Sequence, residues 1–377
     1  MMTDQVPFTD LGSMMSDVRS EVDAAIERVV SSGCYIGGRD VEVFEESWAR
    51  YCGSAYAVSV GNGTDALALT LRALQIGPGD EVVLPTNTFV ATAEAVVLCG
   101  ATPRFADVSP RTLLLTPETL EAAIGPRTRA VIVVHLYGQM ADMETVHRVA
   151  ARSRLLILED AAQAHGATSR GRGPGFHSRA ACFSFYPAKN LGALGDAGAI
   201  VTDDPDLAQS LRSLRDHGRA PGSHHLHQMA GTNSRMDAIQ AAVLSVKLRR
   251  LDAWTDARRR IAMYYRTRLA GSAVRLVADY PYSRSVYHLL VARVPDRDRV
   301  RADLARAGIG TGIHYPTACH EQPPYRQFAR GTLPAAEQAS REILSLPMYP
   351  HLTRAQVTRV CDTLLSLVPA PEHPDVA

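Results

Sequence analysis

The chain has 377 residues, of which 46% are hydrophobic and 21% charged, and its formal net charge at pH 7 is +1. Because a single hydrophobic core stops growing at about 250–300 residues, this length predicts one large domain and a smaller second one. The even charge balance excludes a general attraction to nucleic acid or to an anionic membrane, so we expect small-molecule ligands.

The first residues of the chain do not resemble a targeting signal. Residues 1–5 contain neither a basic run nor an apolar run, and no apolar run elsewhere reaches the roughly 18 residues of a membrane span. We therefore expect a cytoplasmic protein that does not contact the membrane.

From residue 55 to about 205, short apolar runs alternate with helical patterns, which predicts a mostly parallel sheet covered by helices on both faces. The first unit is a strand at 55–60, a glycine turn at 61–63 and a helix over 64–74. The further strands that we predict lie at 81–85, 131–134, 155–158, 181–185 and 199–201.

One helix, rich in leucine and arginine, is predicted to follow Asp237 and to run toward Arg260. Beyond about residue 265 a separate strand-and-helix pattern begins. We therefore place an N-terminal segment and a large α/β domain over residues 1–250, and a small C-terminal α/β domain over residues 251–377.

Asp160 is the first candidate site residue. Ligands of open α/β sheets gather beyond the carboxyl ends of the strands, and Asp160 directly follows the apolar run at 155–158 and Glu159. A buried carboxylate there needs a positive partner, for example the protonated ring nitrogen of pyridoxal phosphate (PLP). Alternatively, Asp160 could cap a helix that begins with Ala161.

Lys189 is the second candidate, because it follows the strand at 181–185 and precedes Gly192 by three residues. The chain has many arginines, but Lys189 and Lys247 are its only lysines. This bias favours a lysine chosen for its amine, since a desolvated amine can be neutral, form a Schiff base and carry a proton. A surface lysine over a turn is the alternative.

The turn Gly61-Asn62-Gly63-Thr64 joins a strand to a helix, so its backbone amides and the helix dipole favour an anion such as phosphate. Ser184 could add a hydroxyl. Gly61, Gly63 and Ala66 also fit the dinucleotide-binding pattern, so a nicotinamide oxidoreductase is the rival interpretation. Its ribose-binding acid should end the next strand, whereas Glu81 begins that strand.

These segments together resemble the nucleotide-sugar aminotransferases of the DegT/StrS family, which are fold-type I PLP enzymes. The resemblance covers nearly the whole chain and includes the motifs Gly-Asn-Gly-Thr-Asp-Ala-Leu, His-Leu-Tyr-Gly and Gly-Thr-Asn-Ser-Arg. It implies an α/β fold-type I transferase with a mostly parallel seven-stranded sheet. The matching segments are residues 61–67, 85–92, 135–138, 159–166, 183–192, 195–199, 231–237 and 314–316.

The resemblance also implies roles for individual residues. Lys189 would bind PLP as a Schiff base, Asp160 would contact the ring nitrogen, and Gln163 would lie near the ring hydroxyl. Phe89 would stack on the ring, although without this context a core position would be its ordinary interpretation.

The cofactor phosphate would be held by Gly63, Thr64 and Ser184. Asn233 would reach the same phosphate from the neighbouring subunit, so that the active site would need a homodimer.

Some members of the family carry histidine in place of the lysine and act as dehydratases, so Lys189 favours transamination. The resemblance implies that L-glutamate gives its amino group to a nucleotide-linked keto sugar and leaves as 2-oxoglutarate. The motifs are most similar to enzymes that aminate dTDP-linked keto-6-deoxysugars for antibiotics, at C3 or C4. A cyclitol or another cyclic ketone is the alternative substrate. Candidate substrate-binding residues are Tyr186, Arg219, His227, His314 and Tyr315.

His224, His225 and His227 form a cluster that could hold a metal, but no nearby carboxylate or cysteine completes a ligand set. We expect a mobile substrate loop over 219–231 and no metal. The six scattered cysteines, which form no CxxC pair, predict neither a disulfide framework nor a zinc site.

Overall fold

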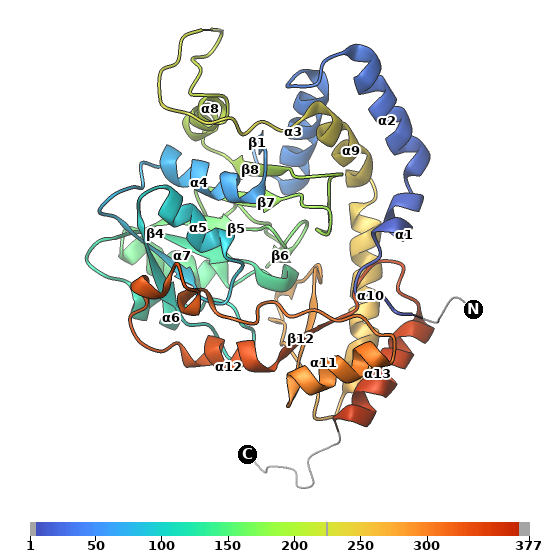
Figure 1. Cartoon of the computed structure of the whole chain (residues 1–377). Helices are drawn as coiled ribbons and strands as arrows, with labels where there is room; N and C mark the ends of the chain where they lie inside the picture. The colour runs from blue at the N-terminus through green and yellow to red at the C-terminus, as the bar shows by residue number, and fades with distance from the viewer. Residues whose placement is uncertain (1–4, 224, 369–377) are drawn as a thin grey trace.

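A seven-stranded sheet lies at the centre of the computed structural model, which describes residues 5–223 and 225–368 (Figure 1). Its strand order is β1-β8-β7-β5-β4-β2-β3. All pairs from β7 to β3 are parallel, whereas β8 runs antiparallel to both β1 and β7. The strands are β1 (Tyr56–Val60), β2 (Glu81–Pro85), β3 (Thr102–Ala106), β4 (Thr128–Val134), β5 (Leu156–Asp160), β7 (Ala180–Ser184) and β8 (Gly198–Thr202).

The mostly parallel seven-stranded sheet is thereby confirmed, and six of its strands lie where the sequence predicts them. The strand pattern missed β3, because Pro103 and Arg104 interrupt the apolar run that would identify it.

Helices cover both faces of the sheet, because successive strand residues contribute to opposite cores. In β4, Val131 and Val133 pack into one apolar cluster, whereas Ala130 and Ile132 pack into the other. The first cluster includes α2 (Arg19–Ser32), α3 (Arg39–Cys52), α7 (Met143–Arg152) and α9 (Ala238–Leu248), and the second includes α4 (Gly63–Ala73), α5 (Ala91–Leu98) and α8 (Pro205–Leu214). Figure 1 shows α4 and α5 on one side of the sheet and α3 and α9 on the other.

A third apolar cluster joins Val6 to residues of the C-terminal part of the chain. It packs around a three-stranded antiparallel sheet in the order β12-β11-β9. The elements are α10 (Leu251–Leu269), β9 (Arg275–Leu276), β11 (Leu290–Arg293), α11 (Arg297–Arg306), β12 (Ile343–Leu346) and α13 (Arg354–Leu367). The boundary between residues 250 and 251 stays a prediction.

The remaining elements are short connections. They are α1 (Leu11–Ser16), α6 (Pro117–Ala123), the 3-10 helix η1 (Leu136–Gly138), the paired strands β6 (Thr168–Ser169) and β10 (Ser283–Arg284), η2 (Cys319–Glu321), η3 (Arg326–Phe328) and α12 (Pro334–Glu342).

The single helix predicted from Asp237 toward Arg260 is wrong. The structure has two helices, because α9 ends at Leu248 and α10 begins at Leu251. Arg249 and Arg250 lie at the break, where both donate to the carboxylate of Glu21 on α2. Neither glycine nor proline marks this break, so the leucine periodicity could not reveal it.

Among the residues that the structure describes, no helix is both long and apolar enough to span a membrane.

Candidate active site

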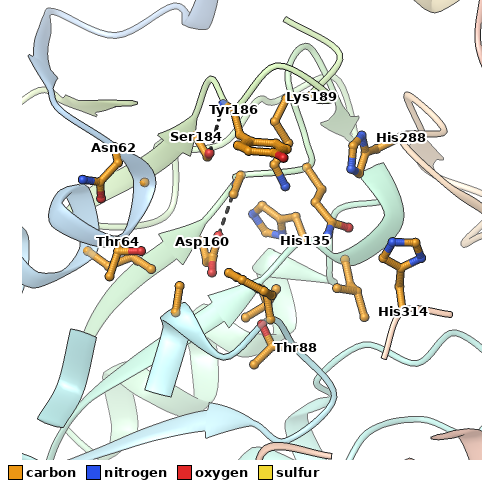
Figure 2. A pocket seen from close by; sticks show the side chains of 18 of the residues that line it. Asn62, Thr64, Thr88, His135, Asp160, Ser184, Tyr186, Lys189, His288 and His314 are labelled. Atoms are coloured by element: carbon orange, nitrogen blue, oxygen red, sulfur yellow. Dashed lines mark hydrogen bonds between the residues drawn. The ribbon is translucent and has the colours of Figure 1, made fainter. Parts of the chain in front are cut away.

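A cavity of about 510 Å³ lies at the carboxyl ends of β4, β5 and β7 and beside the first turn of α4 (Figure 2). Parallel strands bring residues from distant parts of the chain to the same edge of the sheet, which is where ligands bind in such folds. Ten of the predicted site residues line the cavity: Gly63, Thr64, Phe89, Asp160, Gln163, Ser184, Tyr186, Lys189, His314 and Tyr315.

Asp160 is the last residue of β5 and is 7% exposed. Its Oδ2 accepts a hydrogen bond from the Thr92 hydroxyl at 2.7 Å, and Thr92 in turn lies 2.8 Å from the Thr88 hydroxyl. Its Oδ1 accepts from the backbone N–H of Ala162 at 3.2 Å. No helix begins at Ala161, so the carboxylate belongs to the cavity and not to a helix cap.

Lys189 lies in a tight turn that follows β7. Its backbone N–H donates to the Tyr186 carbonyl at 2.8 Å, and a Cβ on Gly192 would come within 2.3 Å of the Pro187 carbonyl oxygen. The turn can therefore close only with glycine at position 192. The buried amine of Lys247 donates to the Gly192 carbonyl and braces the turn from α9.

The amine of Lys189 points into the cavity. Burial lowers the pKa of Lys189 to about 8, against a smaller opposing effect of the Asp160 carboxylate. Near pH 8, a substantial fraction of a lysine with this pKa is the neutral amine. The neutral amine is the form that attacks a carbonyl.

The first turn of α4 has the features of a phosphate site. The Asn62 side chain caps the helix by accepting from the backbone N–H of Asp65 at 2.8 Å. A Cβ on Gly63 would lie 2.7 Å from the Cβ of Ser184, so glycine allows the helix to meet the end of β7. The backbone N–H groups of Gly63 and Thr64 are in the first turn, where a helix favours an anion.

Gln163 links the floor of the cavity to its rim. Its Oε1 accepts from the backbone N–H of Tyr137 at 2.6 Å, and its Nε2 donates to the Tyr315 hydroxyl at 3.1 Å. The Tyr315 ring lies 5.6 Å from the ring of Phe89. The Phe89 side chain is 53% exposed, so it is not part of the core.

His314 reaches the cavity from the C-terminal part of the chain. Its ring stacks on Phe8 at 5.7 Å, and its Nδ1 lies 2.8 Å from the Ser345 hydroxyl. Burial, and then the positive charge of Lys189, lower the pKa of His314 to about 4, so the imidazole is neutral at pH 7.

Three predicted residues do not line the cavity of this chain: Asn233, Arg219 and His227. The side chain of Arg219 pairs with Asp216 at 3.0 Å, and His227 Nδ1 lies 2.8 Å from the His217 carbonyl oxygen. Asn233 is exposed.

Of the histidine cluster, His224 lies outside the described residues. Within those residues, no group of histidine, cysteine and carboxylate side chains could hold a metal ion.

Several polar side chains line the cavity without having been predicted from the sequence. His135 directly follows β4, so the rule that revealed Asp160 could have found it. His288 precedes a strand and gives no such signal. The full set is Asn62, Thr88, His135, Asp196 and His288.

The sequence model of the DegT/DnrJ/EryC1/StrS aminotransferase family matches residues 16–365. The chain belongs to this family. It is 47% identical over 365 residues to the dTDP-3-amino-3,4,6-trideoxy-alpha-D-glucose transaminase of Streptomyces venezuelae, with 96% of each chain covered.

Two solved structures show the same fold. The crystal structure of S. venezuelae DesV in complex with a ketimine intermediate has a TM-score of 0.95 and 46% identity, covering 99% of this chain and 100% of that chain. NtdA from Bacillus subtilis with bound cofactor PMP has a TM-score of 0.91 and 31% identity, covering 97% of this chain and 86% of that chain. The protein is a PLP-dependent sugar aminotransferase of fold-type I.

The nicotinamide interpretation is wrong. The glycine turn follows β1, which lies at the edge of the sheet and, within the described residues, pairs with β8 alone and antiparallel to it. A dinucleotide-binding unit needs two adjacent parallel strands joined by the helix that follows the glycine turn.

The lining residues fit PLP by their chemistry. The cavity contains an amine with a lowered pKa, a buried carboxylate and backbone amides at a helix N-terminus. When bound, PLP supplies an electron sink that stabilises a carbanion beside the substrate nitrogen.

Proposed function

We propose that the protein transfers the amino group of L-glutamate to a dTDP-linked keto-6-deoxysugar, with carbon 3 as the favoured position and carbon 4 as the alternative. The observation that carries this proposal is the single cavity that combines the Lys189 amine, the Asp160 carboxylate and the first turn of α4. The names of similar transaminases, which specify 3-amino dTDP-sugars, support the substrate class.

Lys189 is the proposed Schiff-base lysine and the residue that carries the proton in both half-reactions. Asp160 is proposed to hold the cofactor ring nitrogen protonated, in an orientation that the Thr92 hydroxyl fixes. Gln163 is proposed to lie near the ring hydroxyl and Phe89 against the ring face. The cofactor phosphate is assigned to Gly63, Thr64 and Ser184.

The proposed active form is a homodimer. In the described part of the chain, Lys189 is the sole lysine or arginine that lines the cavity. Glutamate has two carboxylates and a dTDP-sugar has a diphosphate, so additional cations are needed. Asn233 and Arg219 of a second copy are proposed to approach the cofactor and the nucleotide, respectively.

Exposed apolar side chains at the cavity and beside the beginning of α9 support this assembly. Phe89 and Tyr186 are 53% and 55% exposed, and Tyr35 and Leu194 are 50% and 46% exposed. Leu194 and Tyr35 both contact the beginning of α9, through hydrogen bonds to Gln240 and Ala238. Burial of such side chains stabilises subunit contacts.

The further proposed substrate contacts are Tyr186, His227, His314 and Tyr315.

The absorbance spectrum of the purified protein with PLP tests the proposed function. A Schiff-base band should form, glutamate should convert it to the pyridoxamine form, and Lys189→Ala should lack it. The pyridoxamine enzyme is then mixed with dTDP-3-keto and dTDP-4-keto sugars and with an inosose. If the inosose is aminated and neither dTDP-keto sugar is, the substrate is a cyclitol and not a nucleotide-linked sugar. Absence of the band in the wild-type protein would contradict the proposal.

A further inference from the structure

His288 lines the cavity, but the proposed function gives this histidine no role. It lies just before β11, in the C-terminal part of the chain, and it lines the same cavity as Lys189. Figure 2 shows the imidazole of His288 and the Lys189 side chain at the same end of the cavity.

The hydrogen bonds of Asn190 fix the tautomer of this imidazole. Asn190 is 1% exposed, and its Nδ2 donates to the Val286 carbonyl oxygen at 3.0 Å. A carbonyl can only accept, so the amide NH₂ must face Val286 and the amide Oδ1 must face His288. The Nδ1 of His288, 3.2 Å from that oxygen, therefore carries the hydrogen.

The other ring nitrogen is left as an acceptor. Burial, followed by the positive charge of Lys189, lowers the pKa of His288 well below its usual value. The ring is therefore neutral at pH 7, and since Nδ1 has the hydrogen, Nε2 has only a lone pair. A neutral acceptor binds a hydroxyl or an ammonium and does not bind a carboxylate.

Lys189 is the donor that best matches this lone pair. Within the described residues no hydrogen bond or ion pair is found for its Nζ, although an ammonium has three N–H donors. Asp160 and Asp196 are the carboxylates that line the cavity, and Asp160 accepts hydrogen bonds from Thr92 and Ala162. Asn190, which orients the imidazole, is the next residue to Lys189, so one turn sets both groups.

We propose that the Lys189 ammonium, whose Nζ makes no hydrogen bond within the described residues, reorients to donate to Nε2 of His288 and is thereby positioned between proton transfers, an inference that rests on the proposed function. The lysine takes a proton from the amino donor as a neutral amine and becomes an ammonium. His288 orients that ammonium without removing the proton. His288 is therefore a positioning residue.

The chain offers a direct test, because Lys189 and Lys247 are its only lysines. Full-length, PLP-free protein labelled with [ε-¹³C]lysine should give two side-chain signals, whose shifts report the pKa of each amine. Lys247 is the internal control, since it braces the same turn from α9. The variants are His288→Phe, which removes the acceptor, and His288→Gln, which keeps one.

The expected result is a fall of about one unit in the pKa of Lys189 in His288→Phe, because a hydrogen bond to the ammonium favours that form. The pKa should return toward the wild-type value in His288→Gln. The other charged and titratable groups around the pair stay in place, so they do not account for the shift: His135, Asp160, His165, Arg258 and His314.

An unchanged or raised Lys189 pKa in His288→Phe would overturn the proposal. A pKa shift of Lys247 in that variant would reveal a disturbed turn. The pKa of Lys189 is then compared between His288→Gln and His288→Asn, which has a shorter side chain. A higher Lys189 pKa in His288→Gln would support the proposal, and equal values would overturn it. This measurement contains no PLP, so its outcome is independent of whether the Schiff-base band forms.

The rates of the two half-reactions of the PLP-loaded enzyme distinguish two possible hydrogen-bond partners of His288, namely Lys189 and a hydroxyl of the sugar. If His288 positions the lysine, His288→Phe should slow the glutamate and sugar half-reactions by a similar factor, roughly five- to tenfold. A loss confined to the sugar half-reaction would assign the lone pair to a sugar hydroxyl and would contradict the proposal.

Discussion

The strand-end region around Asp160 and Lys189 differs from the segment 216–235 in how it is held. Asp160 and Lys189 lie in or next to strands of a buried sheet, and hydrogen bonds within the chain orient their surroundings. Asn233 and His227 are exposed, and Arg219 is paired to Asp216 outside the cavity. The proposed catalytic residues therefore lie within the fold of one chain, whereas the proposed contacts of Asn233 with the cofactor phosphate and of Arg219 with the nucleotide depend on a second copy.

The strongest test of this difference is Asp160→Asn, which should lower kcat by roughly a thousandfold. An amide cannot hold the cofactor ring nitrogen protonated, but it keeps the shape of the carboxylate and one acceptor oxygen. Single-turnover kinetics with glutamate measure the loss. Asp196→Asn, which changes a carboxylate on a loop of the same cavity, is the matched control. Equal losses of kcat in both variants would mean that the carboxylate at the strand end contributes no more to catalysis than the carboxylate on the loop.

The pH dependence of PLP uptake should also be set within one chain, by the pKa of Lys189. With a pKa of about 8, Lys189 is mostly an ammonium below pH 8 and mostly a neutral amine above it. The rate at which PLP-free protein forms the Schiff-base band should therefore rise roughly tenfold between pH 7 and pH 9. Stopped-flow absorbance measures this rate. A flat profile would show that burial does not lower the pKa of this amine.

Mixed dimers test whether Asn233 serves the other subunit. Asn233→Ala should weaken PLP binding by roughly tenfold, which equilibrium titration measures. At a PLP concentration that leaves Asn233→Ala mostly without cofactor, a heterodimer of Lys189→Ala and Asn233→Ala should recover about half of the wild-type activity, because one of its sites is then intact. No recovery, with both variants folded and dimeric, would place Asn233 in the site of its own chain.

The smallest expected effect concerns the support of Asp160. Thr92→Val removes the hydroxyl that donates to Asp160 Oδ2 while keeping the side-chain volume. Loss of one hydrogen bond to a carboxylate should reduce kcat by roughly five- to tenfold and leave the KM for the sugar unchanged. Steady-state kinetics test this. Thr145→Val, on α7, is the control, and a larger rise in KM than loss of kcat would contradict the positioning role.

The sequence by itself predicted the features that depend on neighbouring residues. Alternating apolar runs predicted the parallel sheet, and their position just after apolar strands indicated Asp160 and Lys189 as site residues. The glycine turn at 61–63 was found in the same way. These features are local, because strand periodicity and helix N-termini follow from residues a few positions apart.

Tertiary structure alone decided the features that depend on distant contacts. The break between α9 and α10 has no glycine or proline signal, and Arg249 and Arg250 at the break meet Glu21 far away in the sequence. His288 enters the cavity because Asn190, 98 residues earlier, fixes its ring. Phe8 and His314 stack from opposite ends of the chain. Hydrogen bonds and packing between remote segments leave no periodic pattern in a sequence, so only the folded chain shows which of them meet.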